Sequence, residues 1–245
     1  MNLRALLPNL VTAANAFFGM LGILAVFQNR FEWALLLFVL GVICDFFDGF
    51  LARLLGVTSP LGVQLDSLAD LVTSGVLPGV LVYQLTRKQS DAYWDLTSFV
   101  LSDGGVFTLS QSGLIGLVLT LGAAYRLARF NISTDQTHYF KGLATPANAL
   151  FFLGYPALLS TPFLTPLHTL LSQTYTVAFF VLFFVFLMNS PLRMFKIKWE
   201  AKSDKIYGTL LVVGAILLFV NLGSAAFSLS VVWYLLLCLI RNVSL

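Results

Sequence analysis

The stretch that decides the fold is CDFFDGFLARLLGVTSPLGVQLDSLAD, residues 44–70. Four aspartates interrupt this otherwise apolar sequence: Asp45, Asp48, Asp66 and Asp70. Spacings of three and four residues place the two members of each pair on one face of a helix. Between the pairs, two glycines, Ser59 and Pro60 predict a tight turn, which makes the two helices antiparallel neighbours. The sequence therefore predicts that four carboxylates come together.

Apolar residues dominate the rest of the chain as well. The 245 residues are 58% hydrophobic and only 10% charged, with a mean hydropathy of +0.89. In a soluble globular protein about a quarter of the residues are charged, so this composition excludes a soluble enzyme. The net charge of +3 is too small to indicate nucleic-acid binding. We expect one integral membrane domain over residues 1–245 and no nucleic acid among its partners.

A helix that crosses a bilayer needs about 20 apolar residues. The sequence offers eight such stretches: residues 9–28, 33–54, 63–85, 112–130, 146–163, 173–190, 207–222 and 226–241. Three prolines interrupt the fifth stretch, so counts of six or seven spans remain open. The expected fold is all-α, a polytopic integral membrane helical bundle of six to eight transmembrane helices, with eight favoured.

The basic residues predict the orientation of these helices, because positive side chains concentrate on the cytoplasmic side. With eight spans, only Arg30, Arg87 and Lys88 lie on the side opposite the termini. The other eleven share the side of the termini: Arg4, Arg53, Arg126, Arg129, Lys141, Arg193, Lys196, Lys198, Lys202, Lys205 and Arg241. We therefore expect a multi-pass protein of the cell (inner) membrane, with its termini and its aspartates facing the cytoplasm.

Two loops stand out in this topology. The loop at 192–206 carries five of the eleven basic residues. It either attracts anionic lipid headgroups or only sets the orientation. The segment 86–111 contains Gly104, Gly105 and several Ser and Thr residues, and is expected to be an external loop.

Aspartates within apolar helices need a cationic partner. A charged residue at the bilayer centre costs about 2.5 to 3.5 kcal/mol, and Arg53 is the only nearby basic residue. Mg2+ or Mn2+ prefers carboxylate oxygens, and two such ions would balance four aspartates. Two alternatives remain open. The aspartates could be hydrated residues at helix ends without a function, or they could form the ion site of a proton- or cation-coupled transporter.

The spacing of the whole stretch is D-x2-D-G-x2-A-R-x8-G-x3-D-x3-D. Its fixed positions are Asp45, Asp48, Gly49, Ala52, Arg53, Gly62, Asp66 and Asp70. This pattern resembles the signature of the CDP-alcohol phosphatidyltransferases at every fixed position. PNLVTAAN, residues 8–15, is similar to the Pro-Asn-x-x-Thr sequence at the start of that family's first helix.

Three further segments resemble the branch of this family that uses serine, the phosphatidylserine synthases. They are residues 64–79, 125–131 and 140–149. One departure is the sequence Gly-Leu-Ala-Thr-Pro at 142–146, where that branch commonly has Gly-Leu-Pro-Thr-Pro. The resemblance implies transfer of a phosphatidyl group from CDP-diacylglycerol to L-serine, giving phosphatidylserine and CMP. Glycerol phosphate or inositol phosphate remains an alternative acceptor.

The resemblance also implies roles for individual residues. Asp45, Asp48, Asp66 and Asp70 would hold two divalent cations, and Asp70 would also act as the general base. The residues implied for binding CDP-diacylglycerol are Asn9, Thr12, Gly49, Arg53, Ser59 and Gly62. For Arg53, a competing interpretation is a membrane anchor at the cytoplasmic end of its helix. The family further implies a homodimer.

A second polar group is predicted to bind the serine acceptor. It consists of Arg126, Arg129, Asn131 and Lys141. The two arginines are three residues apart on one helix face, so together they could present a guanidinium fork to the serine carboxylate. Anchoring of the fourth span by positive charge is an equally good interpretation of the same residues.

Overall fold

The computed structural model describes residues 3–57, 59–87, 93–95, 108–132, 140–194 and 202–243. Helices dominate these ranges, which confirms the all-α prediction. The α-helices are α1 Leu3–Phe27, α2 Phe31–Leu54, α3 Pro60–Asp70, α4 Leu77–Arg87, α6 Ile115–Ile132, α7 Thr145–Leu159, α8 Thr165–Leu171, α9 Thr174–Asn189, α10 Lys202–Leu222 and α11 Ala226–Val243. Three shorter helical segments join some of them: the π-helix η1 Leu71–Val76 and the 3-10 helices η2 Pro162–Leu164 and η3 Gly223–Ala225.

Two short antiparallel strand pairs accompany the helices. Strand β1, Tyr93–Asp95, pairs with β2, Thr108–Ser110, so that Trp94 lies opposite Leu109. Strand β3, Phe140–Lys141, pairs with β4, Arg193–Met194. The predicted loops at 86–111 and 192–206 are described only in part: residues 88–92, 96–107 and 195–201 lie outside the described residues.

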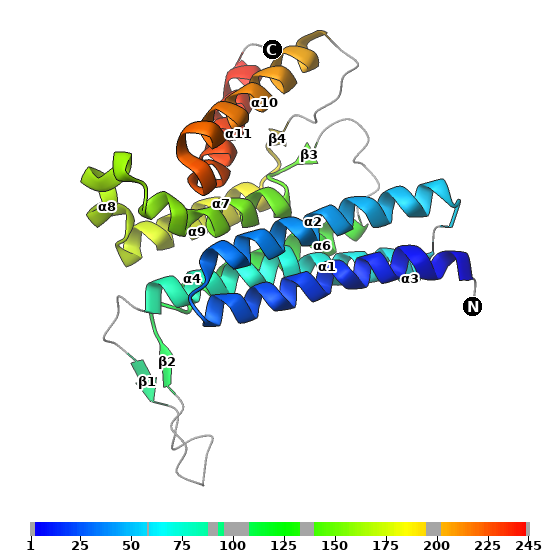
Figure 1. Cartoon of the computed structure of the whole chain (residues 1–245), viewed down its shortest axis with the longest axis horizontal. Coiled ribbons are helices and arrows are strands. Elements are labelled where there is room, and N and C mark those ends of the chain that lie inside the picture. Colours follow the sequence, from blue (N-terminus) through cyan, green and yellow to red (C-terminus); the bar gives the residue numbers. More distant parts are fainter. Residues whose placement is uncertain are drawn as a thin grey trace.

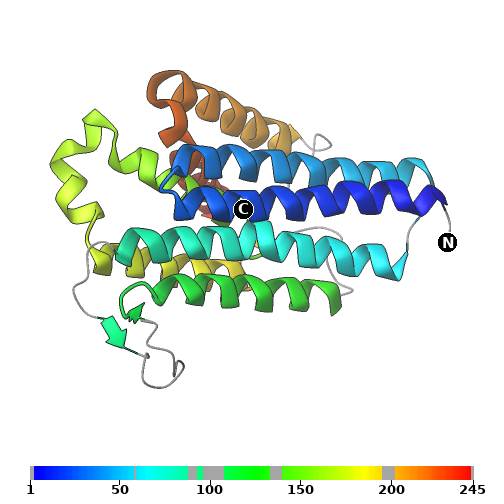
Figure 2. The same cartoon turned by 60° about the horizontal axis from the view of Figure 1, so that its bottom comes forward.

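The N-terminal half forms a layer of long helices that run alongside one another (Figures 1 and 2). Helix α1 packs against α2 on one side and against α3, η1 and α4 on the other. Helix α6 then packs against α4 and η1. Helices α2 and α3 are antiparallel, as predicted, and α1 packs against both of them. The backbones of α2 and α3 therefore stay apart, and these two helices approach each other mainly through their side chains.

The C-terminal half packs against this layer through α7 and α9. One buried cluster joins α6, α7, α9 and α11, and at its centre the rings of Phe151 and Phe184 stack with centroids 4.2 Å apart. A second buried cluster joins α1, α2, α4 and α7, and includes Phe38 and Leu81. Because α7 contributes to both clusters, it connects the two halves of the bundle.

Helices α4 and α6 cross at two glycines that allow their backbones to touch. A Cβ atom built on Gly116 would lie 2.2 Å from the carbonyl oxygen of Gly79. A Cβ atom on Gly79 would in turn lie 2.8 Å from the carbonyl oxygen of Gly116. Small residues at such crossings are typical of membrane helix pairs, where close packing drives association.

We therefore predict that Gly116→Ala destabilises the protein. The added methyl group would meet backbone atoms that have no room to move, and overpacking of this kind costs about 1 to 3 kcal/mol. The measurement is the midpoint of thermal unfolding in detergent. Leu117→Ala, on the exposed side of the same helix, is the control. Equal midpoints for Gly116→Ala and the unsubstituted protein would contradict the prediction.

The length and hydropathy of the helices fit a multi-pass membrane protein. Four described stretches are long and apolar enough to cross a bilayer, namely Leu6–Phe27, Phe31–Leu54, Pro60–Arg87 and Lys205–Arg241. A fifth is possible if the pair Thr145–Leu159 and Pro162–Leu171, bent by 80°, counts as one span. The last of the four stretches is divided at Gly223, whose φ is +55°, and its two parts fold back on each other.

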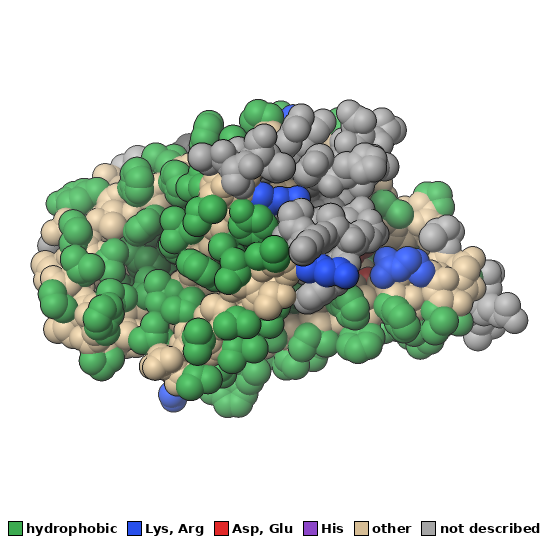
Figure 3. Space-filling model, turned by 90° about the horizontal axis from the view of Figure 1, so that it is seen from above, with side chains coloured by type: hydrophobic (Ala, Val, Ile, Leu, Met, Phe, Trp, Pro, Cys, Tyr) green, Lys and Arg blue, Asp and Glu red, His purple; other side chains and the backbone are tan. Residues whose placement is uncertain are grey.

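A helix occupies each of the eight predicted positions, but the number of crossings stays a prediction. Helix α9 has only 16 residues, and α7 ends at Leu159, before the chain turns through η2 into the unpredicted helix α8. Seen from above, the surface is mostly hydrophobic, with only scattered basic side chains (Figure 3). Such a surface is suited to contact with lipid acyl chains.

Candidate metal and nucleotide site

Three aspartates from two helices form a cluster at one end of the bundle. Asp45 and Asp48 come from α2, and Asp66 comes from α3. One carboxylate oxygen from each lies within 4.8 Å of the others. The spacing of three residues puts the two α2 aspartates on one helix face, and the turn after Leu54 brings α3 back toward them. The structure thus brings together residues 18 or more positions apart in the sequence.

The cluster fits a divalent cation. Asp48 is only 6% exposed, and its Oδ2 atom has no hydrogen-bond partner in the described part of the chain. A buried carboxylate oxygen without a partner is costly, and neighbouring carboxylates add repulsion. A hard cation such as Mg2+ or Mn2+ takes oxygen ligands of this kind and would remove both costs.

Asp70 lies one turn beyond Asp66 and is held by a separate set of contacts. Its Oδ1 accepts a hydrogen bond of 3.3 Å from the Asn15 side chain on α1. The Thr73 hydroxyl donates to the Asn15 side-chain oxygen at 2.7 Å, which fixes the orientation of that amide. Asn15 and Thr73 are both buried. The structure thus orients Asp70, whereas its predicted role as a fourth metal ligand stays a prediction.

A pocket of about 150 Å3 opens beside the cluster. Most residues predicted to bind the nucleotide donor line it, together with Asp48 and Asp66. The predicted residues in its wall are Asn9, Thr12, Gly49, Ser59 and Gly62. These residues come from α1, α2 and the start of α3. The predicted donor site and the carboxylate cluster therefore form one continuous site.

Local contacts explain the two small residues of this wall. The Ser59 hydroxyl caps α3 by accepting a 3.0 Å hydrogen bond from the Gly62 amide. A Cβ atom on Gly62 would lie 3.2 Å from that hydroxyl and 3.3 Å from the Asn9 side-chain oxygen. On α2, a Cβ atom on Gly49 would meet only the Arg53 guanidinium, at 3.5 Å. The exposed Arg53 guanidinium thus lies beside the pocket, where it could pair with a phosphate.

The residues predicted to bind serine lie on the C-terminal part of α6 and beyond it. Arg126 donates to the Thr145 hydroxyl on α7 and interacts electrostatically with Asp70. Arg129 is exposed and donates to the carbonyl oxygen of Asn189 at 3.2 Å. The two arginines therefore contact different helices, and only Arg126 is placed toward the aspartates. The side-chain oxygen of Asn131 accepts a 3.0 Å hydrogen bond from Ser67, and the Lys141 side chain lies outside the described residues.

Sequence reasoning missed several buried polar residues near the site. Asn15 and Thr73 were missed as partners of Asp70, although a polar amide within an apolar span is a signal of function. Asn148 on α7 is completely buried, and neither atom of its amide has a partner among the described residues. The Ser74 hydroxyl and Arg126 Nε are also buried atoms without a hydrogen-bond partner among the described residues. Buried polar atoms without partners are unusual and indicate places for water or ligand.

The cluster predicts a specific metal-binding property. Replacing Asp48 with Asn removes the charge of its most buried ligand, so we expect the affinity for Mn2+ to fall by about tenfold or more. Mn2+ titration of the purified protein, followed by electron paramagnetic resonance, measures this affinity. Glu32→Gln removes a carboxylate at the opposite end of α2 and serves as the control. Equal Mn2+ affinity for Asp48→Asn and the control would exclude Asp48 as a ligand.

Several known proteins are similar to this chain. One relative is the CDP-diacylglycerol–serine O-phosphatidyltransferase of Helicobacter pylori strain J99, which is 36% identical over 59% of this chain and 54% of the relative. Another is the CDP-diacylglycerol–serine O-phosphatidyltransferase of Bacillus subtilis, which is 31% identical over 57% of this chain and 69% of the relative. The archaetidylserine synthase of Methanothermobacter thermautotrophicus is 30% identical over 64% of this chain and 63% of its own. The chain spans about half the length of the first of these relatives. The model of the CDP-alcohol phosphatidyltransferase family matches residues 5–201, so the chain belongs to that family.

Proposed function

We propose that this protein transfers a phosphatidyl group from CDP-diacylglycerol to L-serine, giving phosphatidylserine and CMP. One observation carries the proposal: three aspartates within 4.8 Å of one another adjoin a pocket lined by Asn9, Thr12, Gly49, Ser59 and Gly62. Anionic clusters next to a pocket with a nearby arginine suit a pyrophosphate donor bound through cations. The names of the relatives support serine as the acceptor.

The donor occupies the pocket between α1, α2 and α3. Asn9, Thr12 and Ser59 offer hydrogen bonds to the nucleotide, Gly49 and Gly62 leave room for it, and Arg53 pairs with phosphate oxygens. Asp45, Asp48, Asp66 and Asp70 hold two divalent cations, Mg2+ or Mn2+. When bound, these ions polarise the phosphoryl oxygens and stabilise the charge that develops on the leaving group.

Asp70 is the general base. The serine hydroxyl oxygen forms a bond to the phosphorus of the phosphatidyl group, the bond from that phosphorus to the CMP oxygen breaks, and the hydroxyl proton passes to Asp70. Asn15 holds one carboxylate oxygen of Asp70, which leaves the other free to take the proton. The hydroxyl must lie within hydrogen-bond reach for this transfer.

Arg126 binds the carboxylate of the serine acceptor. Its contact with Thr145 and its interaction with Asp70 place its guanidinium next to the base. We assign Arg129, Asn131 and Lys141 to the same acceptor site, on the same membrane side. Because a guanidinium pairs with a carboxylate through two parallel hydrogen bonds, it selects an amino acid over an uncharged alcohol.

The cellular setting follows from the distribution of charge. Residues 1–245 form a single domain in the cell membrane, with both termini and the catalytic end of the bundle in the cytoplasm. The acyl chains of the donor lie between helices in the cytoplasmic leaflet, so that the lipid never leaves the membrane. Two copies of the chain associate as a homodimer.

The decisive test is incorporation of radiolabelled serine into lipid by the purified protein in detergent, with CDP-diacylglycerol and Mn2+ or Mg2+. We expect metal-dependent phosphatidylserine and one CMP for each lipid formed. Asp70→Asn is expected to lower the rate by about 100- to 10,000-fold, the usual contribution of a general base. Glu32→Gln, the same chemical change far from the site, is expected to keep full activity.

Other outcomes would redirect the proposal. Release of CMP only with glycerol phosphate or inositol phosphate would keep the mechanism and exclude serine as the acceptor. Absence of CMP release with every alcohol tested, combined with cation flux in vesicles, would favour an ion-coupled transporter instead.

Arg126 offers a separate test of the acceptor site. We expect Arg126→Gln to raise KM for serine by about 10- to 100-fold, since a hydrogen bond to a charged group contributes about 1.5 to 3 kcal/mol. KM for CDP-diacylglycerol should change little, and the two constants are measured by varying one substrate at a time. Arg30→Gln is the matched control, because Arg30 precedes α2 at the end of that helix farthest from Asp48. Equal effects of both substitutions on KM for serine would contradict this role.

A further inference from the structure

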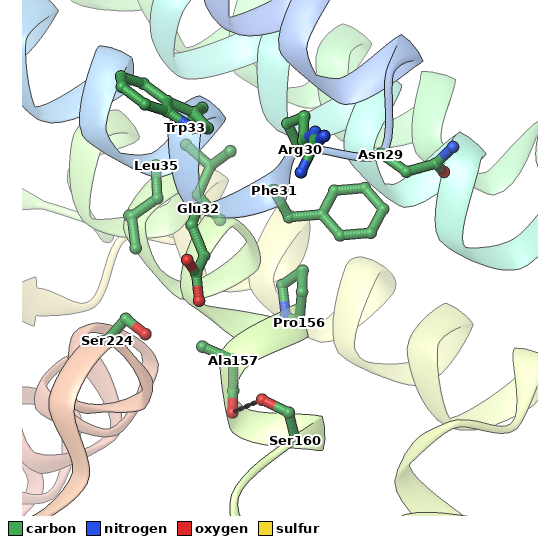
Figure 4. Close-up of a pocket in the computed structure, with 11 residues that line it drawn as sticks. Asn29, Arg30, Phe31, Glu32, Trp33, Leu35, Pro156, Ala157, Ser160 and Ser224 are labelled. Atoms are coloured by element: carbon green, nitrogen blue, oxygen red, sulfur yellow. Dashed lines mark hydrogen bonds between the residues drawn. The ribbon is translucent and has the colours of Figure 1, made fainter.

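A larger cavity lies at the membrane face opposite the aspartates. It measures about 360 Å3 and lies between the connection of α1 to α2, the start of α2, the second half of α7 and Ser224 (Figure 4). Asp48 is 16 residues beyond Glu32 on α2, which corresponds to about 24 Å along the helix. The cavity is therefore separate from the catalytic site. Its volume is within the usual range for small-ligand pockets.

The rim of this cavity is held in one conformation. Asn29 adopts a positive φ of 57°, and its side-chain oxygen accepts a 3.2 Å hydrogen bond from Gln84 on α4. The backbone amides of Asn29 and Arg30 donate to Val26 and Ala25, each at 2.9 Å. These contacts close the turn before α2 and orient the residues that follow. A rigid rim reduces the entropy lost when a ligand binds.

The cavity carries charges of both signs that do not neutralise each other. Arg30 and Glu32 are both exposed, and within the described part of the chain neither side chain forms an ion pair. Figure 4 shows the Glu32 carboxylate directed toward Ala157 and Ser224, whereas the Arg30 guanidinium extends in another direction. A ligand with separated positive and negative groups could therefore contact both residues.

An apolar wall lies next to these charges. Leu35 and Leu153 belong to the buried cluster of α1, α2, α4 and α7, and they form part of the cavity lining together with Phe31 and Pro156. Trp33, 60% exposed, is on the same turn of α2. Tryptophan is enriched at the level of lipid headgroups, where its ring meets acyl chains and its N–H meets water. The cavity thus lies where headgroups of the surrounding bilayer are found.

We propose that this cavity binds the headgroup of a membrane phospholipid that carries both a phosphate and an ammonium group. Arg30 pairs with the phosphate, Glu32 pairs with the ammonium, and Ser160 and Ser224 offer hydrogen bonds at the edge. The apolar wall contacts the glycerol and the first acyl carbons. The ligand comes from the leaflet opposite the catalytic site and is neither donor nor product in transit, because the two sites lie at opposite faces.

The test uses the full chain, purified in detergent and stripped of lipid. Native mass spectrometry measures its affinity for phosphatidylethanolamine and for phosphatidylglycerol, which lacks the ammonium group. We expect tighter binding of phosphatidylethanolamine. Glu32→Gln should weaken that binding by about tenfold and leave phosphatidylglycerol unchanged, while Arg30→Gln should weaken both lipids by about tenfold. Glu32→Asp should restore the preference, and Arg87→Gln, on the same membrane face, should change nothing.

Several results would overturn the proposal. Equal affinities for the two lipids, or no change with Glu32→Gln, would exclude an ammonium site. Free phosphoethanolamine that displaces the lipid at equal concentration would assign the cavity to a soluble compound. Serine transfer is measured on the same samples and should be unchanged by Glu32→Gln, so loss of the proposed activity and loss of lipid binding are separable results.

Discussion

The structure depends on holding negative charges close together at the end of a membrane bundle. Carboxylates of α2 and α3 within 4.8 Å repel one another, and the more so where the surroundings exclude water. Helix α1 packs against both helices, and two apolar clusters keep the bundle together around them. The fold therefore supplies the packing energy that keeps these carboxylates near one another. Such an arrangement is what a metal-dependent transferase needs, because positioning is most of the work in phosphoryl transfer.

The contacts of Asp70 show how one residue can be distinguished from three similar ones. Asp45, Asp48 and Asp66 face one another, whereas Asp70 is tied to α1 through Asn15 and from there to Thr73. The carbonyl oxygen of Ala69, at 2.9 Å, is an alternative acceptor for the single hydroxyl proton of Thr73. The amide of Asn15 therefore fixes the position of Asp70 independently of the other three aspartates.

Much of this arrangement could be predicted from local patterns. Spacings of three and four residues are enough to place the aspartates of each helix on one face, and hydropathy is enough to place the helices. The partnership of Asn15 with Asp70 could not be predicted, because it joins residues 55 positions apart through the packing of α1 on η1. Nor could the sequence predict that Arg126 contacts α7 whereas Arg129 contacts α9, because these contacts depend on where the two helices lie. The bend after α7 depends on the turn around Pro162, which hydropathy alone does not reveal.

The π-helical segment η1 affects how the two ends of the helical stretch from α3 to α4 are rotated relative to each other. Leu71–Val76 lies between Asp70, which faces the catalytic end, and Gly79, which fits against α6. A π-turn accommodates one more residue than an α-turn. Because the wider π-turn absorbs this extra residue, deleting one residue there would restore a regular helix and leave Asp66 and Asp70 at nearly the same angle to the crossing at Gly79. The segment therefore accommodates one extra residue without turning the catalytic face away from the packing face, whereas a one-residue insertion or deletion in the flanking α-helical turns would rotate one face by about 100° relative to the other.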